Sequence, residues 1–391
     1  MTLVVIGANP TVAKSIVGLP EKVIHVQSPD ALALDASVLG DAGILTADFL
    51  DISSFLLFVA DVLKPLVPSA IVSITELGLE PAAAAAELLG VRGVALEVVR
   101  NTRDKLAMRQ VLKKKAPHLN ADFASGDDPG AVARLFSEHA RVVAKPVDGV
   151  GSEAVSLLLS IEDLPEDRRV AGTLLEQFLG GLEFSVETLS SGGQHAFMGI
   201  AEKGTTGGFV EVSHIMPPPS LDSRRQSLVT RAVGELLDAI GITEGPSHTE
   251  VKVDGDQVTV IETHTRLGGD GIADLVRLTT GINWRKAAVG WPIGAALDQT
   301  KSVAAAAATV FFTAPPGRVA SVAERPALNH GSIVEWDIQV QPGDAVRPLK
   351  SSGDRLGMAI LTASTPADCK AAVAEVLNEP TVRTHSDRSP A

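Results

Sequence analysis

The chain has 391 residues, of which 45% are hydrophobic and 21% are charged. This length and composition favour a globular protein of two or three domains. The formal net charge of −13 argues against nucleic-acid binding through a broadly basic surface, although a local basic groove could still hold a compact anion such as phosphate.

Cysteine content and the first residues limit the class of protein further. A single cysteine, Cys369, leaves no intramolecular disulfide and no thiolate metal cluster, and we interpret it as a small apolar residue of an alanine-rich helix. The first seven residues contain no basic leader or cleavage site, and no apolar run is long enough to span a membrane. We therefore expect a cytoplasmic protein with no membrane partner.

The N-terminal part of the chain has the pattern of a small parallel α/β domain. Apolar runs at Leu3–Ile6, Val23–Val26 and Ala70–Ile74 are typical of buried strands. A helix is predicted over Glu80–Leu89, because Gly90 follows it as a stop signal. We set this domain at residues 1–98.

A compact second unit is predicted over residues 99–172. The spacing of apolar residues predicts helices over Thr102–Lys115 and Pro129–His139, and a strand over Arg141–Lys145.

The remaining residues, 173–391, predict a mixed or antiparallel sheet with two long helices. The overall fold class is therefore mixed α/β. Beyond Glu379, the polar segment Thr384–Ser389 has little to bury, and we expect a mobile tail. The predicted strands are 174–175, 184–187, 197–200, 250–253, 258–262, 309–312, 332–336 and 358–361, and the helices are Asp222–Ile240 and Pro366–Leu377.

A glycine-containing loop follows the strand that ends at Lys145. Gly149 and Gly151, followed by Ser152, permit backbone conformations that let successive N–H groups close over phosphate oxygens. A lysine beside the loop adds a point charge to the same anion. Glycine-rich turns after strands are also common without any ligand, so both interpretations are open at this point.

Further along, a strand, a short connector and a second strand run from Leu174 to Val186. Such a connector can present backbone amides and an apolar wall to a purine ring. Glu183, at the start of the second strand, can accept hydrogen bonds from ribose hydroxyls.

Two glutamates on adjacent predicted strands suggest a metal site. Glu250 and Glu262 offer hard oxygen ligands, which suit Mg²⁺ together with water and phosphate oxygens. Strict alternation of side chains along each strand places Glu262 on the face of Val258 and Val260 and Glu250 on the opposite face of the hairpin. The two carboxylates can meet only if a bulge or an end-of-strand twist intervenes.

This ordered set resembles the ATP-grasp superfamily, over nearly the whole chain from Gly7 to the last helix. The segment Asn101–Arg109 is similar to the family's first nucleotide-lysine region, and Lys145 to its second lysine. The resemblance implies ATP and Mg²⁺ as cofactors, with Mn²⁺ as a possible substitute. It implies phosphate contacts from Lys105, Lys145 and the loop of Gly149, Gly151 and Ser152; adenine contacts from Glu176, Phe178 and Leu179; a ribose contact from Glu183; and metal ligation by Glu250 and Glu262.

One position departs from the family pattern. The family commonly has asparagine two residues after the second metal glutamate, and here that residue is His264. Neutral imidazole is a poorer Mg²⁺ ligand than a carboxamide oxygen, so His264 is a candidate to orient substrate or a glutamate instead.

Within the superfamily, several segments are similar to the branch of L-amino-acid ligases and related antibiotic-pathway ligases. These are Ile74–Glu76, Gly199–Lys203 and Phe209–Pro217. The resemblance implies that the amino-acid substrates are bordered by Glu76, Glu211, His214, His264, Arg266 and the turn of Gly268 and Gly269, and that Lys203 is within reach of phosphate.

Structural alternatives remain open for these substrate residues. Glu76 could cap the helix that begins near Leu79, Glu211 could be a solvated strand residue, and His214 could be an ordinary loop histidine. Arg266 suits a carboxylate or a developing acyl phosphate, but it could also form a structural salt bridge with Asp270.

The function that the resemblance implies is ATP-dependent ligation of a small-molecule carboxylate to an amine through an acyl phosphate, with release of ADP and phosphate. Related enzymes are often dimers, so a homodimer is one possible state and the oligomeric state stays open; no nucleic acid or membrane partner is expected. Two alternatives remain: an ATP-grasp carboxylase or purine-pathway ligase, and a nucleotide-binding module without catalysis.

Overall fold

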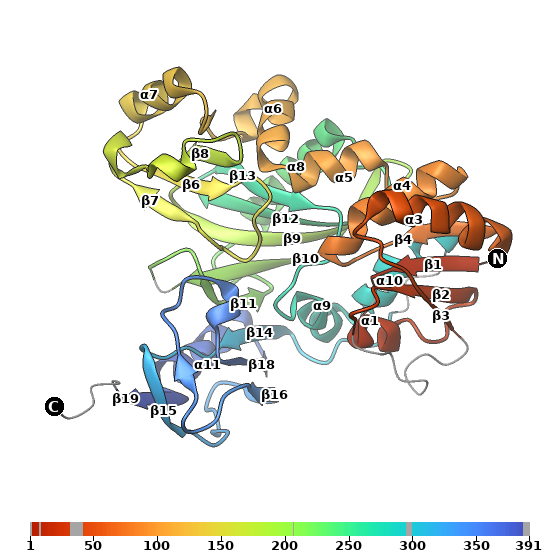
Figure 1. Ribbon diagram of the computed structural model, residues 1–391. Coiled ribbons are helices and arrows are strands. Elements are labelled where there is room, and N and C mark those ends of the chain that lie inside the picture. Colours follow the sequence, from red (N-terminus) through yellow and green to blue (C-terminus); the bar gives the residue numbers. More distant parts are fainter. Residues whose placement is uncertain (1, 8, 32–41, 206, 295–298, 386–391) are drawn as a thin grey trace.

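The computed structural model describes residues 2–7, 9–31, 42–205, 207–294 and 299–385. Figure 1 shows an N-terminal α/β region, a small sheet with α6 and α7 near it, and a long sheet that continues into the C-terminal region. Within the described residues, no helix has the length and apolar character needed to cross a membrane.

The N-terminal region is a four-stranded sheet whose neighbouring strands all run parallel, as the sequence predicts. The run Leu3–Ile6 is buried completely, because its alternate side chains enter two different cores. The strands, in sheet order, are β3 (Gly43–Thr46), β2 (Lys22–Gln27), β1 (Thr2–Ile6) and β4 (Pro68–Val72), and the helices are α1 (Pro10–Ser15), α3 (Ile52–Phe58) and α4 (Leu79–Leu89).

One predicted helix is two helices in the structure. The sequence predicts a helix over Thr102–Lys115, but α5 (Leu96–Arg103) ends before Asp104 and α6 (Lys105–Lys115) begins after it. The Asp104 carboxylate accepts a hydrogen bond from Ala107 N at 3.0 Å and so caps α6. Because of this break, the first residue of α6 is the predicted phosphate lysine.

The central region is a four-stranded antiparallel sheet packed against one helix. The predicted boundary after residue 172 excludes the strand Thr173–Gln177, but this strand pairs with both of its neighbours in the central sheet. The central region therefore reaches at least to residue 177, and the predicted boundary at residue 98 falls inside α5. In sheet order the strands are β5 (Phe123–Ser125), β8 (Thr173–Gln177), β6 (Val142–Pro146) and β7 (Ser156–Leu158), and the helix is α7 (Pro129–Glu138).

The largest sheet has eight strands, and its neighbouring strands are antiparallel. Apolar residues of α8 (Ser223–Ile240), including Val233 and Leu236, pack against Phe184 and Val251 on one face. The other face packs against α9 (Ile272–Thr280) and α10 (Trp284–Gly290). In sheet order the strands are β13 (Gln257–His264), β12 (Gly245–Asp254), β9 (Leu182–Ser191), β10 (Gln194–Thr205), β11 (Glu211–Met216), β14 (Ala306–Phe311), β18 (Gly357–Ala363) and β16 (Ser332–Ile338).

The hairpin of β12 and β13 contains the bulge that the two glutamates need. Glu250 lies opposite Glu262, whereas the next pair is Val251 with Val260, so the register shifts by one residue between them. The extra residue reverses the parity beyond that point. Both carboxylates therefore lie on the same side of the hairpin.

The C-terminal region continues the large sheet and adds a three-stranded sheet. The predicted tail is wrong at its start: Thr384 lies in β19 (Val382–His385), which pairs with β15 (Gly317–Val322). A strand at this position is stabilised by backbone hydrogen bonds and by burial of Val382, so polar side chains on its exposed side do not exclude it. Residues 386–391 of the predicted tail lie outside the described residues. The other elements are β17 (Ala345–Val346) and α11 (Pro366–Asn378), which contains the buried Cys369.

Candidate active site

A cavity of about 770 Å³ lies between the small central sheet and the eight-stranded sheet. Residues of β6, β7 and β8 line one side, and residues of β9, β12 and β13 line the other. The cavity brings together residues that the sequence places more than 160 positions apart. The predicted site residues on its wall are Lys105, Lys145, Gly149, Gly151, Ser152, Glu176, Phe178, Leu179, Glu183, Glu211, His214, Glu250, Glu262, Arg266 and Gly269.

Four predicted site residues are not on the cavity wall but support residues that are. Lys203 contacts Glu250. His264 Nε2 lies 3.1 Å from Glu262 Oε1. Glu76 pairs with Arg266, and Gly268 N donates to a buried carboxylate behind the wall.

Part of the cavity wall is apolar and suits a flat aromatic ring. Val143, Leu157 and Ile261 line it, together with Phe178. The guanidinium of Arg141 lies over the Phe178 ring, 4.0 Å from its centroid, and so restricts the ring's orientation.

The carboxylate of Glu176, predicted to line the adenine site, is bound by two cations. Its Oε2 lies 2.5 Å from Lys145 Nζ, and its Oε1 accepts a hydrogen bond from Arg109 Nε. Burial would raise the pKa of Glu176, but Arg109 and Lys145 outweigh that effect and lower it. Glu176 therefore holds Lys145 at the cavity wall.

Arg109 is a supporting residue for which the sequence pattern predicts no role. It has no exposed surface, and its guanidinium also donates to the carbonyl oxygens of Val260 and Ile261 at 2.8 and 3.0 Å. These contacts join α6 to β13 through the interior. A signal existed in the sequence: Arg109 lies four residues after Lys105 and three before Leu112, so it shares a helical face with these two residues, which are buried.

The loop between β6 and β7 is held close to Lys105. Lys105 Nζ donates to Gly149 O at 2.6 Å, and Lys105 N donates to Val147 O at 2.9 Å. Gly151 and Ser152 have φ values of +63° and +60°. Positive φ at two successive residues is typical of a type I′ turn, which Glu153 N closes by donating to Val150 O at 3.3 Å.

Glu250 and Glu262 are adjacent, ionised and each balanced by a lysine. Glu262 Oε2 lies 3.1 Å from Lys105 Nζ, and Glu250 Oε1 lies 2.7 Å from Lys203 Nζ. Burial and mutual repulsion would raise the pKa of Glu250, but Lys203 and His248 hold it well below the usual range. Two charged carboxylates with hard oxygen donors at a cavity wall fit the requirements of a divalent metal.

Lys203 is enclosed by three carboxylates. Its Nζ lies 2.7 Å from Glu183, 2.8 Å from Glu211 and 2.7 Å from Glu250. Burial would lower the pKa of Lys203, but these carboxylates raise it well above its usual value, so the lysine is charged. Glu211 is 9% exposed, which contradicts the alternative of a solvated strand residue.

A second supporting network, which sequence reasoning missed, lies behind Glu250. Glu187 has no exposed surface and contacts His248 Nδ1 at 2.5 Å, Trp284 Nε1 at 2.8 Å and Gly268 N at 3.1 Å. Burial would lower the pKa of His248, but Glu187 and Glu250 raise it to about 9. His248 Nε2 lies 3.2 Å from Glu250 Oε1, so this network restricts the orientation of the glutamate.

The N-terminal region contributes Glu76 to the site. Arg266 Nε donates to Glu76 Oε2 at 2.6 Å, and Arg103 Nε donates to Glu76 Oε1 at 3.0 Å. Glu76 therefore does not cap the helix near Leu79, whose N-terminus has no side-chain cap. The suggested salt bridge of Arg266 to Asp270 is also wrong, because the partner of Arg266 is Glu76.

Asp270 instead joins His214 to the C-terminal region. Its carboxylate accepts two hydrogen bonds from Arg355, at 3.0 and 2.9 Å, and lies 3.2 Å from His214 Nε2. Arg355 also lies over the Phe311 ring, 3.8 Å from its centroid. Asp270 has a φ of +59°, an unfavourable conformation for a non-glycine residue that the surrounding contacts must maintain.

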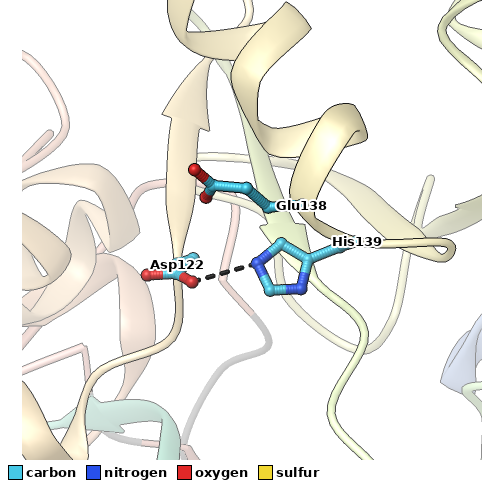
Figure 2. Close-up of side chains that lie close together, drawn as sticks. All are labelled: Asp122, Glu138 and His139. Atoms are coloured by element: carbon cyan, nitrogen blue, oxygen red, sulfur yellow. Dashed lines mark hydrogen bonds and ion pairs between the residues drawn. The ribbon is translucent and has the colours of Figure 1, made fainter.

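A group of possible metal ligands also lies outside the cavity lining. Figure 2 shows Asp122, Glu138 and His139 near the end of α7, with His139 Nε2 3.0 Å from Asp122 Oδ2. Asp122 and Glu138 are exposed, so both carboxylates are hydrated without a metal.

The chain is similar to known proteins in sequence and in fold. A family model for the ATP-grasp domain matches residues 138–274, and one for L-amino acid ligase C-terminal domain 2 matches residues 310–385. An alanine–anticapsin ligase of Bacillus subtilis is 24% identical over 245 residues, which are 55% of this chain and 52% of that protein. The chain thus spans about half the length of the curated relatives it matches.

Solved structures share the fold over nearly the whole chain. An L-amino acid ligase from Bacillus licheniformis superposes with a TM-score of 0.78 at 22% identity and covers 99% of both chains. Phosphoribosylglycinamide synthetase from Anaerococcus prevotii superposes with a TM-score of 0.70 at 17% identity, over 98% of this chain and 99% of the other.

The chain contains an ATP-grasp domain at residues 138–274, and its fold over nearly the whole chain is that of an L-amino acid ligase. The C-terminal match extends the similarity to the L-amino acid ligase branch, which confirms the resemblance and the fold class that the sequence indicates. Proteins of this fold use ATP and a divalent metal.

Replacing Arg109 by Met should lower the free energy of unfolding by about 3–5 kcal/mol, because it leaves the buried Glu176 with one cation fewer. Chemical denaturation measures the change. Arg100→Met is the matched control: Arg100 is 61% exposed beside Glu80, and losing this pair should cost about 1 kcal/mol or less. Equal effects of the two substitutions would contradict a supporting role for Arg109.

Proposed function

We propose that this protein is an ADP-forming carboxylate–amine ligase that joins an amino acid or a similar carboxylate to an amine. The observation that carries the proposal is the single cavity wall on which Lys105, Lys145, Glu250, Glu262 and Arg266 converge. These residues supply a cationic phosphate site, a metal-ligating pair and a cation for the reacting carboxylate. A protein that only binds nucleotide does not need a cation for a reacting carboxylate.

The relatives support an amino-acid substrate. Proteins similar to this chain are named alanine–anticapsin ligase and L-amino acid ligase. The cavity wall also carries Glu211, His214, Arg266 and Asp270. Carboxylates and cations on this wall suit a ligand with both an ammonium and a carboxylate group.

The nucleotide contacts follow from the apolar and the charged residues of the cavity wall. We assign the adenine to the pocket of Phe178 and Leu179, the ribose to Glu183, and the phosphates to Lys105, Lys145 and the Gly149–Ser152 loop. Glu250 and Glu262 would hold Mg²⁺, or Mn²⁺ in its place, which when bound neutralises charge on the phosphates.

The chemistry has two steps. A substrate carboxylate oxygen attacks the γ-phosphorus of ATP, the bond to the β–γ bridging oxygen breaks, and ADP leaves. The amine nitrogen then attacks the acyl carbon of the acyl phosphate, and the tetrahedral intermediate expels phosphate while the nitrogen loses its proton to solvent. Phosphorylation is needed because a carboxylate has no good leaving group.

In both steps the protein positions groups and balances charge. Arg266, held by Glu76, presents its guanidinium to the carboxylate and then to the acyl phosphate. The loop over the phosphates keeps water from the labile intermediate. Three parts of the chain contribute to the proposed site. The N-terminal region supplies Glu76, the central region supplies the loop over the phosphates, and the eight-stranded sheet supplies the metal glutamates.

The proposed reaction predicts equal amounts of ADP, phosphate and amide when the protein is incubated with ATP, Mg²⁺ and mixed amino acids. Product mass spectrometry and an ADP assay measure the ratio. A parallel incubation with bicarbonate as the only carboxylate tests the carboxylase alternative. Formation of AMP and pyrophosphate would mean adenylation instead and would reject the proposal.

Glu262→Gln should reduce turnover by about two orders of magnitude or more, because it removes a metal-ligating charge and the partner of Lys105 while keeping the side-chain shape. Steady-state rates at limiting Mg²⁺ measure the loss. Glu235→Gln, at an exposed position on α8, is the control and should behave as wild type. Normal turnover of Glu262→Gln would refute the metal assignment.

Arg266→Lys should lower kcat by about 10²–10³-fold while nucleotide affinity changes little. The reason is that lysine lacks the planar fork that can hold Glu76 and two carboxylate oxygens together. ATP titration, a thermal melt and steady-state kinetics separate the effects. An unstable variant that turns over normally per folded molecule would show that Arg266 only supports the fold.

A further inference from the structure

The loop over the proposed phosphate site is fastened from the C-terminal region. Three of its residues have contacts beyond the central sheet: Gly149 O accepts from Lys105 Nζ, Ser152 Oγ donates to Phe209 O at 3.0 Å, and Gly151 O accepts from Ser352 N at 3.0 Å. The contact with Ser352 joins segments 201 positions apart and comes from a region outside the ATP-grasp domain match.

The segment that carries Ser352 is rigid. Residues 352–354 form a short 3-10 turn with a capping box between Ser351 and Asp354. Asp354 Oδ2 accepts hydrogen bonds from Ser351 N at 2.9 Å and from Lys350 N at 3.1 Å. The Ser352 N–H takes no part in the capping box and points to the loop.

The same segment is anchored at the proposed substrate end of the cavity. Arg355 Nε donates to Ser352 O at 2.9 Å, and the Arg355 side chain, 7% exposed, is fixed by Asp270. Asp270 in turn contacts His214. Ser352 and Arg355 both line the cavity, so a chain of direct contacts links His214 to Gly151 through residues of this segment.

We propose that Ser352 is a positioning residue: its backbone N–H holds Gly151, so that the C-terminal region closes the phosphate loop and couples closure to the substrate end of the cavity. The effect on catalysis rests on the proposed ligase function, whereas the fastening of the loop does not. Opening the loop admits water to the acyl phosphate, which then gives carboxylate and phosphate in place of amide.

Ser352→Pro tests the hydrogen bond with little disturbance of the turn. Ser352 is the first residue of the 3-10 turn, where proline is well tolerated, and Ser351 is extended with φ −148° and ψ 168°, as a residue before proline prefers. Proline removes the N–H donor, and its ring occupies the space in front of the nitrogen. Ser352→Ala is the matched control because it retains the backbone donor.

Hydrogen–deuterium exchange of the loop 147–155 in the full-length protein without nucleotide is the first measurement. Ser352→Pro should exchange about two- to tenfold faster than wild type, the range expected for loss of one hydrogen bond, and Ser352→Ala should retain the wild-type rate. Equal exchange in the two variants overturns the proposal, whatever reaction the protein catalyses. If Ser352→Pro does not fold, Asp354→Ala replaces it, because this substitution removes the capping box that holds Ser352. Asp354→Ala should also exchange faster than wild type in the loop. A wild-type exchange rate in this variant likewise overturns the proposal.

Kinetics with ATP and the amino-acid mixture are the second measurement. Ser352→Pro should raise the KM for ATP by about two- to tenfold and give more ADP than amide, because the acyl phosphate is partly hydrolysed. A structural defect that only reduces the folded fraction would lower kcat and leave both KM and the ADP-to-amide ratio unchanged. If Ser352→Pro exchanges faster but still forms ADP and amide in equal amounts, then Ser352 holds the loop without affecting catalysis, and the coupling to catalysis is rejected. If wild type forms no amide, the ligase proposal fails, and the exchange result stands by itself.

Discussion

Repulsion between Glu250 and Glu262 is the constraint around which the site is arranged. The bulge in the β12–β13 hairpin places both carboxylates on the same side, where the charge of one raises the pKa of the other. Lys105 from α6 and Lys203 from β10 compensate the two charges. Because these cations come from different regions, both buried charges are compensated only when the central region is docked onto the large sheet.

The need to compensate buried charge also applies to carboxylates behind the cavity wall. A charge removed from water must have partners of opposite sign or hydrogen-bond donors, and each buried carboxylate here has them. Glu187 takes three donors, and Glu176 takes two cations. Buried and fully paired groups lose their rotamer freedom, so the side chains they hold at the cavity wall are already oriented before substrate binds.

Several features could be predicted from the sequence because their causes are local. The continuous apolar runs at Leu3–Ile6 and its neighbours require burial on both faces, which a covered parallel sheet provides. The two glutamates of opposite parity required a bulge, and the structure contains one. The predicted helix over Thr102–Lys115 was wrong because apolar spacing alone does not detect a cap, and Asp104 breaks the helix by capping its second half.

By itself the sequence determined the order of the lysines, the glycine loop and the glutamates, and with it the ATP-grasp fold. It also determined many of the strands and helices, because apolar periodicity acts over a few neighbouring residues. Only the tertiary structure decided which charges pair: Arg266 meets Glu76 across 190 positions, and Trp284 meets Glu187 across 97. Local spacing carries no information about such partners, since they meet only after the sheets have packed. Breaking a buried pairing is costly, because a charge left without a partner in the interior removes about 3–5 kcal/mol from a net stability of about 5–15 kcal/mol.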